Sequence, residues 1–166
     1  MSLQTRLDSL IVAIGADIKL ARKLTSRLTA AVTNSTVTYT ATGLSVTLVA
    51  GKTYRFRAFG QYQTAAITTG IDMRIGGTVT ATRIRYSTFL FGVNNTTVTF
   101  RSGTSMNANL TPSSAVFAAN TDYPWNIEGL IVVNSGGTLT IEFASEVAAS
   151  LTTIQADSYL EVQEVA

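Results

Sequence analysis

The sequence predicts a mainly β protein, an antiparallel β-sandwich of jelly-roll kind, with one α-helix at its N-terminus. Three observations predict this fold. Thr, Ser, Val and Ala dominate the composition, which is typical of β-sheet. From about Val32, apolar and polar residues alternate, and about eight to ten short strands are separated by Gly, Asn and Ser turns. Before that point, apolar residues recur at helical spacing. We therefore predict a helix over residues 1–30 and a β-sandwich domain over residues 31–166.

The N-terminal helix is predicted from a seam of apolar residues spaced alternately by four and three, which is the repeat of a coiled coil. Asp17 occupies a seam position, where a polar residue costs stability but can fix register and oligomeric state. Alternatively, Ile18 faces inward and Asp17 only flanks the seam. We expect the helix to contact other copies or a docking partner, although it could instead pack on its own β domain. The candidate contact residues are Leu3, Leu7, Leu10, Ile14, Asp17 and Leu24.

Turn residues divide the alternating region into predicted strands. In the segment Tyr54–Phe59, the alternation places Tyr54, Phe56 and Ala58 on one face and the arginines on the other. The predicted elements are, in order, a strand over 36–43, two strands over 44–63 around a turn at 50–52, two over 71–86 around Gly76–Gly77, one over 96–100, a mostly loop segment over 102–124, a hairpin over 125–147 around 134–137, and a last strand over 158–165.

The composition excludes several classes of function. The chain has no His and no Cys, which excludes disulfides, the usual zinc ligands and every catalytic triad or dyad that needs these residues. No phosphate-binding loop and no calcium loop is present, so we expect neither cofactor nor metal. The apolar run Leu10–Ala16 is too short to span a membrane and lacks a preceding basic region. We expect a protein folded in a cytosol, without a membrane partner.

Charge is distributed unevenly along the chain. Residues 1–101 contain all twelve Lys and Arg and three acids, a net charge of +9, whereas residues 102–166 contain seven acids and no base, a net charge of −7. We expect opposite charges to meet across strands or across subunits. Nucleic acid is not an expected partner, because the acidic part would cancel the field of the basic part.

Two groups of residues are candidates for chemistry. The acids Asp122, Glu128, Glu142 and Glu146 offer paired carboxylates for acid and base catalysis, but they can equally pair with the arginines of strands 53–59 and 83–86. Tyr123 and Trp125 flank a proline and can form a platform that stacks on a sugar ring, or they can be buried in the core. We expect no enzyme activity.

Two stretches of sequence resemble tailed-bacteriophage virion and fibre proteins. The segment LQTRLDSLIVAIGADIKLARKL, with IGADIK at Ile14–Lys19, is similar to a short helical leader of such proteins. The remainder resembles a β domain of phage structural and fibre proteins over most of its length. The matching segments are GLSVTLVAGKTYRFRAF at 43–59, TAAITTGIDMRIGG at 64–77, RYST at 85–88, IEGLIVVNSGGTLTIEFASEV at 127–147 and ADSYLEVQEV at 156–165.

The resemblance implies a homotrimer whose β heads pack around a threefold axis with the helices at the base. It implies a non-enzymatic structural protein of the virion, assembled in the host cytoplasm and in contact with other capsid or tail proteins. Many fibre proteins carry a longer shaft than this chain, so a capsid decoration or cement protein, or a short head fibre, is the first expectation. The alternative is the receptor-binding head of a tail fibre or spike, with Tyr123 and Trp125 contacting host polysaccharide.

Overall fold

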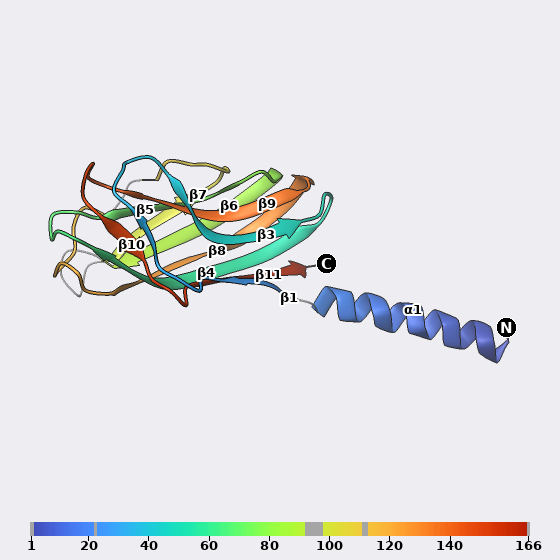
Figure 1. The fold of residues 1–166 in the computed structure, drawn as a ribbon. Coiled ribbons are helices and arrows are strands. Elements are labelled where there is room, and N and C mark those ends of the chain that lie inside the picture. Colours follow the sequence, from blue (N-terminus) through green and yellow to red (C-terminus); the bar gives the residue numbers. More distant parts are fainter. Residues whose placement is uncertain (1, 22, 92–97, 111–112, 166) are drawn as a thin grey trace.

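The computed structural model describes residues 2–21, 23–91, 98–110 and 113–165, and of residues 13–21 it describes the backbone only. Within these residues, one helix is followed by eleven strands (Figure 1). They are α1 Leu3–Ala21, β1 Lys23–Arg27, β2 Val32–Asn34, β3 Thr40–Leu48, β4 Thr53–Thr64, β5 Ile71–Gly77, β6 Thr80–Phe91, β7 Val98–Gly103, β8 Tyr123–Ser135, β9 Gly137–Ser145, β10 Thr152–Ile154 and β11 Tyr159–Val165.

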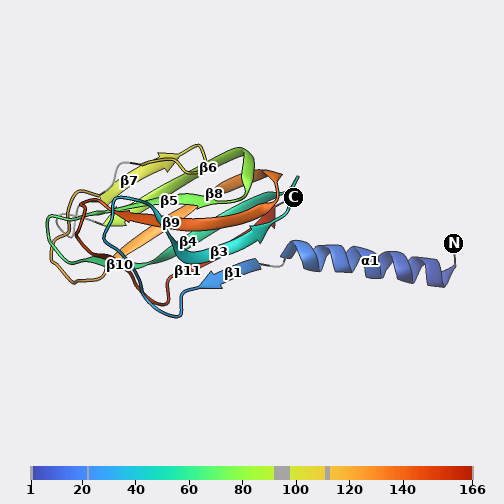
Figure 2. The same ribbon diagram turned by 45° about the horizontal axis from the view of Figure 1, so that its top comes forward.

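The strands form two packed antiparallel sheets (Figure 2). Sheet A has the order β1-β11-β4-β8-β6-β7, with β10 beside β4 and β2 beside β10, and sheet B has the order β3-β9-β5. The pairing is nested, because β1 pairs with β11, β3 with β9 and β4 with β8. Such winding of the two halves of the chain around each other is that of a jelly roll. The predicted fold class, an antiparallel β-sandwich with an N-terminal helix, is confirmed.

The predicted hairpin over 125–147 has its turn near the expected position, but its two strands belong to different sheets. Gly136 separates β8 from β9, yet β8 pairs with β4 and β6 in sheet A, whereas β9 pairs with β3 and β5 in sheet B. Residues 78–79 likewise connect β5 in sheet B to β6 in sheet A. Alternation along a strand specifies which side chains are buried but not which strand lies alongside. The turns therefore pass the chain between sheets instead of closing hairpins.

Strand boundaries differ from the prediction at two other places. The strand expected over 36–43 begins only at Thr40, because Asn34 and Thr36 form side-chain hydrogen bonds that close a turn before it. The strand expected over 96–100 lies at Val98–Gly103, and residues 96 and 97 fall outside the described part. Between β7 and β8, the described residues contain no strand, as the predicted loop over 102–124 requires.

The helix is shorter than predicted, because α1 ends at Ala21 and not near residue 30. Leu24 lies in β1, where it is half-buried against the core of the sandwich, and Leu28 follows the strand and is buried. Leu24 and Leu28 are four residues apart, which places them on one face of a strand as well as in a coiled-coil seam. Thr25 and Ser26 favour extended backbone over helix. The assignment of Leu24 to the helix contact residues is therefore wrong.

The helix projects from one end of the sandwich (Figures 1 and 2). It does not lie along the sandwich, as the alternative of a helix packed on its own domain would require; it contacts the β domain at β11. No helix in the described residues has the length and apolar character needed to cross a membrane.

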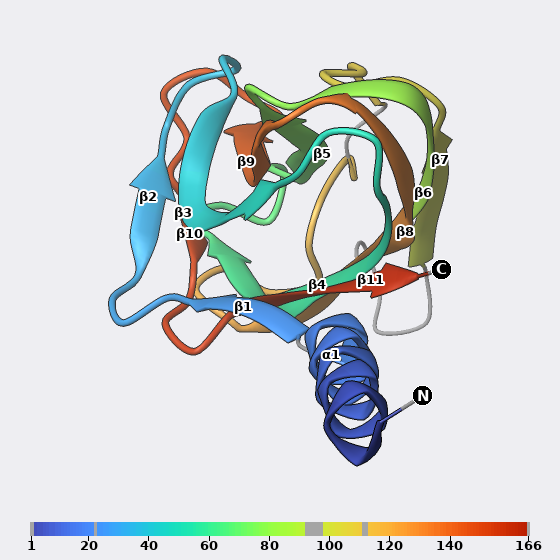
Figure 3. The ribbon, with the colours of Figure 1, turned by 90° about the vertical axis from the view of Figure 1, so that its right-hand side faces the viewer.

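The core lies between the two sheets and is fully enclosed (Figure 3). Its largest buried side chains include Trp125, Tyr62, Phe143 and Met73. Opposite charges meet outside this core, as predicted. Each ion pair among the described residues joins a base of residues 1–101 to an acid of residues 102–166. The pairs are Lys23–Glu161 at 3.1 Å, Lys52–Glu164 at 2.7 Å, Arg74–Glu142 at 2.8 Å, and Arg27–Asp157.

Candidate functional site

The exposed apolar residues of α1 form the first candidate interaction surface. Leu3, Leu7 and Leu10 are 84%, 48% and 55% exposed, and the neighbouring Ile11 and Val12 are also exposed. The side chains of Ile14 and Asp17 lie outside the described residues, so their predicted roles stay predictions. Large apolar side chains gathered on one projecting element are typical of an interaction surface.

The outer face of sheet A forms the second candidate surface, and the sequence analysis does not identify it. Four aromatic residues from different strands lie in one cross-strand row, here called the aromatic row. The register pairs Tyr159 with Phe59, Phe59 with Asn126, Asn126 with Phe89, and Phe89 with Phe100. Phe59, Phe89 and Phe100 are 37%, 39% and 61% exposed. The rings of Phe59 and Tyr159 stand edge to face, 4.3 Å between centroids.

A row of alternating charge lies next to the aromatic row, two residues further along each strand. In this charged row, Arg57 lies between Glu161 and Glu128, and Ser87 and Ser102 complete it on β6 and β7. The Arg57 guanidinium carbon lies 5.6 Å from the centre of the Phe59 ring, so the two rows are in contact. Two adjoining grooves of about 760 and 390 Å³ follow these rows across the face.

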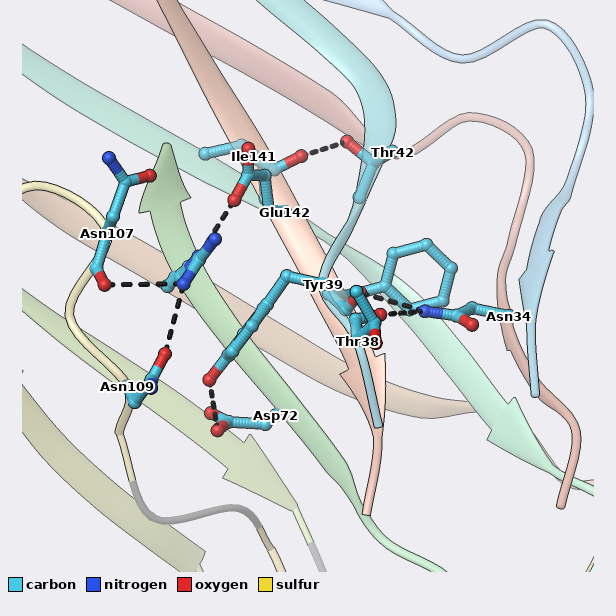
Figure 4. Close-up of polar contacts among 11 residues, drawn as sticks. Asn34, Thr38, Tyr39, Thr42, Asp72, Asn107, Asn109, Ile141 and Glu142 are labelled. Carbon is cyan, nitrogen blue, oxygen red and sulfur yellow. Dashed lines mark hydrogen bonds and ion pairs between the residues drawn. The ribbon is translucent and has the colours of Figure 1, made fainter. Parts of the chain in front are cut away.

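A polar cluster on the outer side of sheet B ties four segments together (Figure 4). The Arg74 guanidinium donates to Glu142 at 2.8 Å and to the Asn109 side chain at 3.0 Å. It also stacks on the Tyr39 ring, 3.9 Å from its centre. The Tyr39 hydroxyl in turn donates to Asp72, which lies two residues before Arg74 on β5. The cluster thereby connects the segment before β3, strands β5 and β9, and the loop after β7.

Burial dominates the titration of this cluster. Asp72 is 8% exposed, and burial raises its pKa from 3.8 to about 6, against the opposing hydrogen bond from Tyr39 and the charge of Arg74. The pKa of Tyr39 is also raised, first by burial and then by its hydrogen bond to Asp72. Arg74 and Glu142 neutralise each other. The cluster is a partly buried structural network that fastens the loop after β7 to the sheet.

Tyr123 and Trp125 do not form the exposed platform that glycan stacking requires. They are only 3% and 1% exposed, and both belong to the core between the sheets. Alternation along β8 turns them inward, and Pro124 between them is the exposed residue. The expectation of a glycan contact through these two rings is therefore wrong for this structure, and the alternative of buried core residues is confirmed.

The candidate acids are distributed over separate parts of the fold. Glu128 lies on the outer face of sheet A beside Arg57, and Glu142 binds Arg74 on sheet B. Glu146 accepts a hydrogen bond from the Gly70 backbone, and Asp122 accepts one from Gln155. Glu128 and Glu142 thus lie on strands of different sheets and do not face each other across a hairpin. No group of three or more acids in the described residues could hold a metal ion.

Comparison with known protein families gives no match, and no well-characterised protein matches the sequence. Among solved structures, the chain is similar to Eiger TNF from S. frugiperda, with a TM-score of 0.39, 8% identity, and 87% of this chain and 93% of that chain covered. It is also similar to the VP2 subviral particle of infectious bursal disease virus, with a TM-score of 0.25 and 13% identity. There, 87% of this chain spans only 41% of the VP2 chain.

Proposed function

We propose that the protein is a non-enzymatic structural protein of a tailed-bacteriophage virion. In this proposal, three copies form a trimer that is displayed on the particle surface as a capsid decoration or cement protein, or as a short head fibre. The observation that carries the proposal is the projecting helix with its exposed Leu3, Leu7 and Leu10. The resemblance of this helical segment and of the β domain to phage virion proteins supports the class of particle.

Exposing these leucine side chains to water is unfavourable in free energy. Each buried apolar square ångström contributes about 25 cal/mol, so burying one leucine side chain in a bundle contributes about 2 kcal/mol. A helix of 19 residues is close to the lower limit for independent stability. It therefore gains most from packing against identical helices.

The experiment is a measurement of solution mass by light scattering on the full chain and on the double variant Leu7→Asp/Leu10→Asp. A matched control is Thr5→Asp/Ser9→Asp, which adds the same two charges at polar, exposed positions of α1. We expect the full chain and the control to have three times the chain mass of 17.6 kDa. The double variant is expected to have a lower mass or a more than tenfold weaker association.

A monomeric full chain at all concentrations would contradict the trimer. Location on the particle is tested separately, with gold-labelled antibody against the β domain on intact virions. Label on the head supports a decoration protein or head fibre, label on the tail contradicts that part of the proposal, and unlabelled particles contradict the virion assignment. Burial of Tyr123 and Trp125 removes the feature that favoured a receptor-binding head.

A further inference from the structure

We infer that the outer face of sheet A is a self-association surface, on which the aromatic row and the charged row of one copy pack against a second copy of this chain. The inference deepens the proposed function, because it assumes that the chain associates with itself, and it assigns part of that association to the β domain. It does not depend on the helix being the main contact.

The aromatic row is the first argument. Three phenylalanines, each more than a third exposed, lie level with one another on β4, β6 and β7, and Tyr159 extends the row onto β11. Single exposed apolar residues are common on protein surfaces, but a row of aromatic side chains crossing a sheet is typical of an interface. Their inward-facing neighbours along the strands already fill the core, so the row contributes nothing to the interior of its own sandwich.

Symmetry makes the second copy a suitable partner. Suppose that two copies are related by a rotation axis parallel to the strands. Each cross-strand row of one copy then lies at the same level along this axis as the same row of the other copy. The aromatic row of one copy then meets the aromatic row of the next, and the charged row meets the charged row. Because Arg57 and Glu128 are neighbours at one height, each copy presents a base and an acid there. One copy can therefore place its base against the acid of the other.

Of the bases next to the charged row, Lys23 is paired with an acid of its own chain, whereas Arg55 contacts a neutral amide and keeps its charge. Lys23 pairs with Glu161 at 3.1 Å, and Arg55 donates to the Gln163 side chain at 2.6 Å. These bases line the larger groove and lie two residues further from the aromatic row. Between two copies related by this axis, the open groove provides the space that separates their Arg55 side chains.

The position of the helix gives a further argument. Figure 3 shows α1 below β11 and β4, on the outer side of sheet A and away from β3 and β9. The helix α1 and the outer face of sheet A thus lie on the same side of the molecule. One symmetry axis outside sheet A can bring both surfaces together, so that the helix contact and the sheet contact form one continuous interface.

The test uses the full chain with Phe89→Asp/Phe100→Asp, and each of these side chains is exposed in the single chain. The matched control is Phe117→Asp, because Phe117 is 59% exposed but lies in the loop before β8. We expect light scattering to show at least tenfold weaker association for the double variant and unchanged association for the control. Association as strong as in the unchanged chain would overturn the inference and leave the trimer of the proposed function standing. A full chain that is monomeric at all concentrations would overturn both.

A second measurement avoids the aspartate substitutions and therefore any effect that they have on folding stability. The chain has no cysteine, so a single Ser102→Cys variant carries one thiol in the charged row, and Ser114→Cys carries one on an exposed loop. Both serines are exposed in the single chain. We expect maleimide to label Ser102→Cys at least tenfold more slowly than Ser114→Cys in the associated protein. Equal labelling rates would overturn the inference.

Discussion

Replacing Asp72 by Asn is expected to remove a pH dependence of folding stability. Asp72 is buried on the outer side of sheet B and accepts a hydrogen bond from the Tyr39 hydroxyl. Asn is nearly the same size and still accepts that hydrogen bond, but it does not ionise. The variant therefore removes the charge and leaves the packing and the contact with Tyr39 in place.

The sign and size follow from the pKa of Asp72, which burial raises from 3.8 to about 6. The folded chain binds this proton more tightly than the unfolded chain does. The stabilising contribution is fully present below pH 3.8 and is lost as the pH rises through about 6. At about 1.4 kcal/mol per pKa unit, the loss is at most about 3 kcal/mol.

The assay is urea denaturation followed by the fluorescence of Trp125, which is the only tryptophan of the chain. The free energy of unfolding is measured between pH 4.5 and pH 7.5, at one protein concentration, for the unchanged chain and for Asp72→Asn. Both chains contain the same ion-paired acids. Subtracting one free energy of unfolding from the other therefore cancels the pH dependence that these acids contribute. Between pH 4.5 and pH 7.5, we expect the variant to gain about 2 kcal/mol on the unchanged chain, because part of the loss already occurs below pH 4.5.

The matched control is Asp122→Asn, because Asp122 is exposed and accepts a hydrogen bond from Gln155. This control measures what the same substitution does to folding stability at an exposed position. Parallel stability curves for Asp72→Asn and the unchanged chain would refute the reasoning. A variant that loses stability relative to the unchanged chain as the pH rises would mean that Arg74 and Tyr39 outweigh burial and hold Asp72 ionised.

Three further substitutions have expected outcomes that urea denaturation at neutral pH can measure. Arg74→Met leaves Glu142 largely buried without its base and is expected to cost about 3 kcal/mol; an unchanged midpoint would mean that the pair contributes nothing. Trp125→Ala, followed by circular dichroism, is expected to cost about 3–5 kcal/mol, whereas an exposed ring would cost little. Gly129→Ala places a Cβ 2.4 Å from the Arg85 carbonyl oxygen and is expected to cost about 1–3 kcal/mol, so a fully stable variant would contradict the close packing of β8 on β6.

The sequence by itself determined the direction of the side chains along β4. Along β4, it predicted Tyr54, Phe56 and Ala58 inward with Arg55 and Arg57 outward, and the structure buries the first three and exposes the two arginines. It also located the turn at residues 50–52 and the last strand. These features are local, because the side-chain period of a strand and the backbone preferences of Gly and Asn depend only on neighbouring residues.

The tertiary structure alone decided which strands are neighbours. Backbone hydrogen bonding carries no sequence label, so the nested pairing of β1 with β11 and β4 with β8 has no signal in the alternation. For the same reason, the aromatic row was not predicted: Phe59, Phe89, Phe100 and Tyr159 are far apart in the chain and are joined only by the register of the strands. The burial of Trp125 and the end of α1 at Ala21 were decided in the same way, by contacts between distant segments.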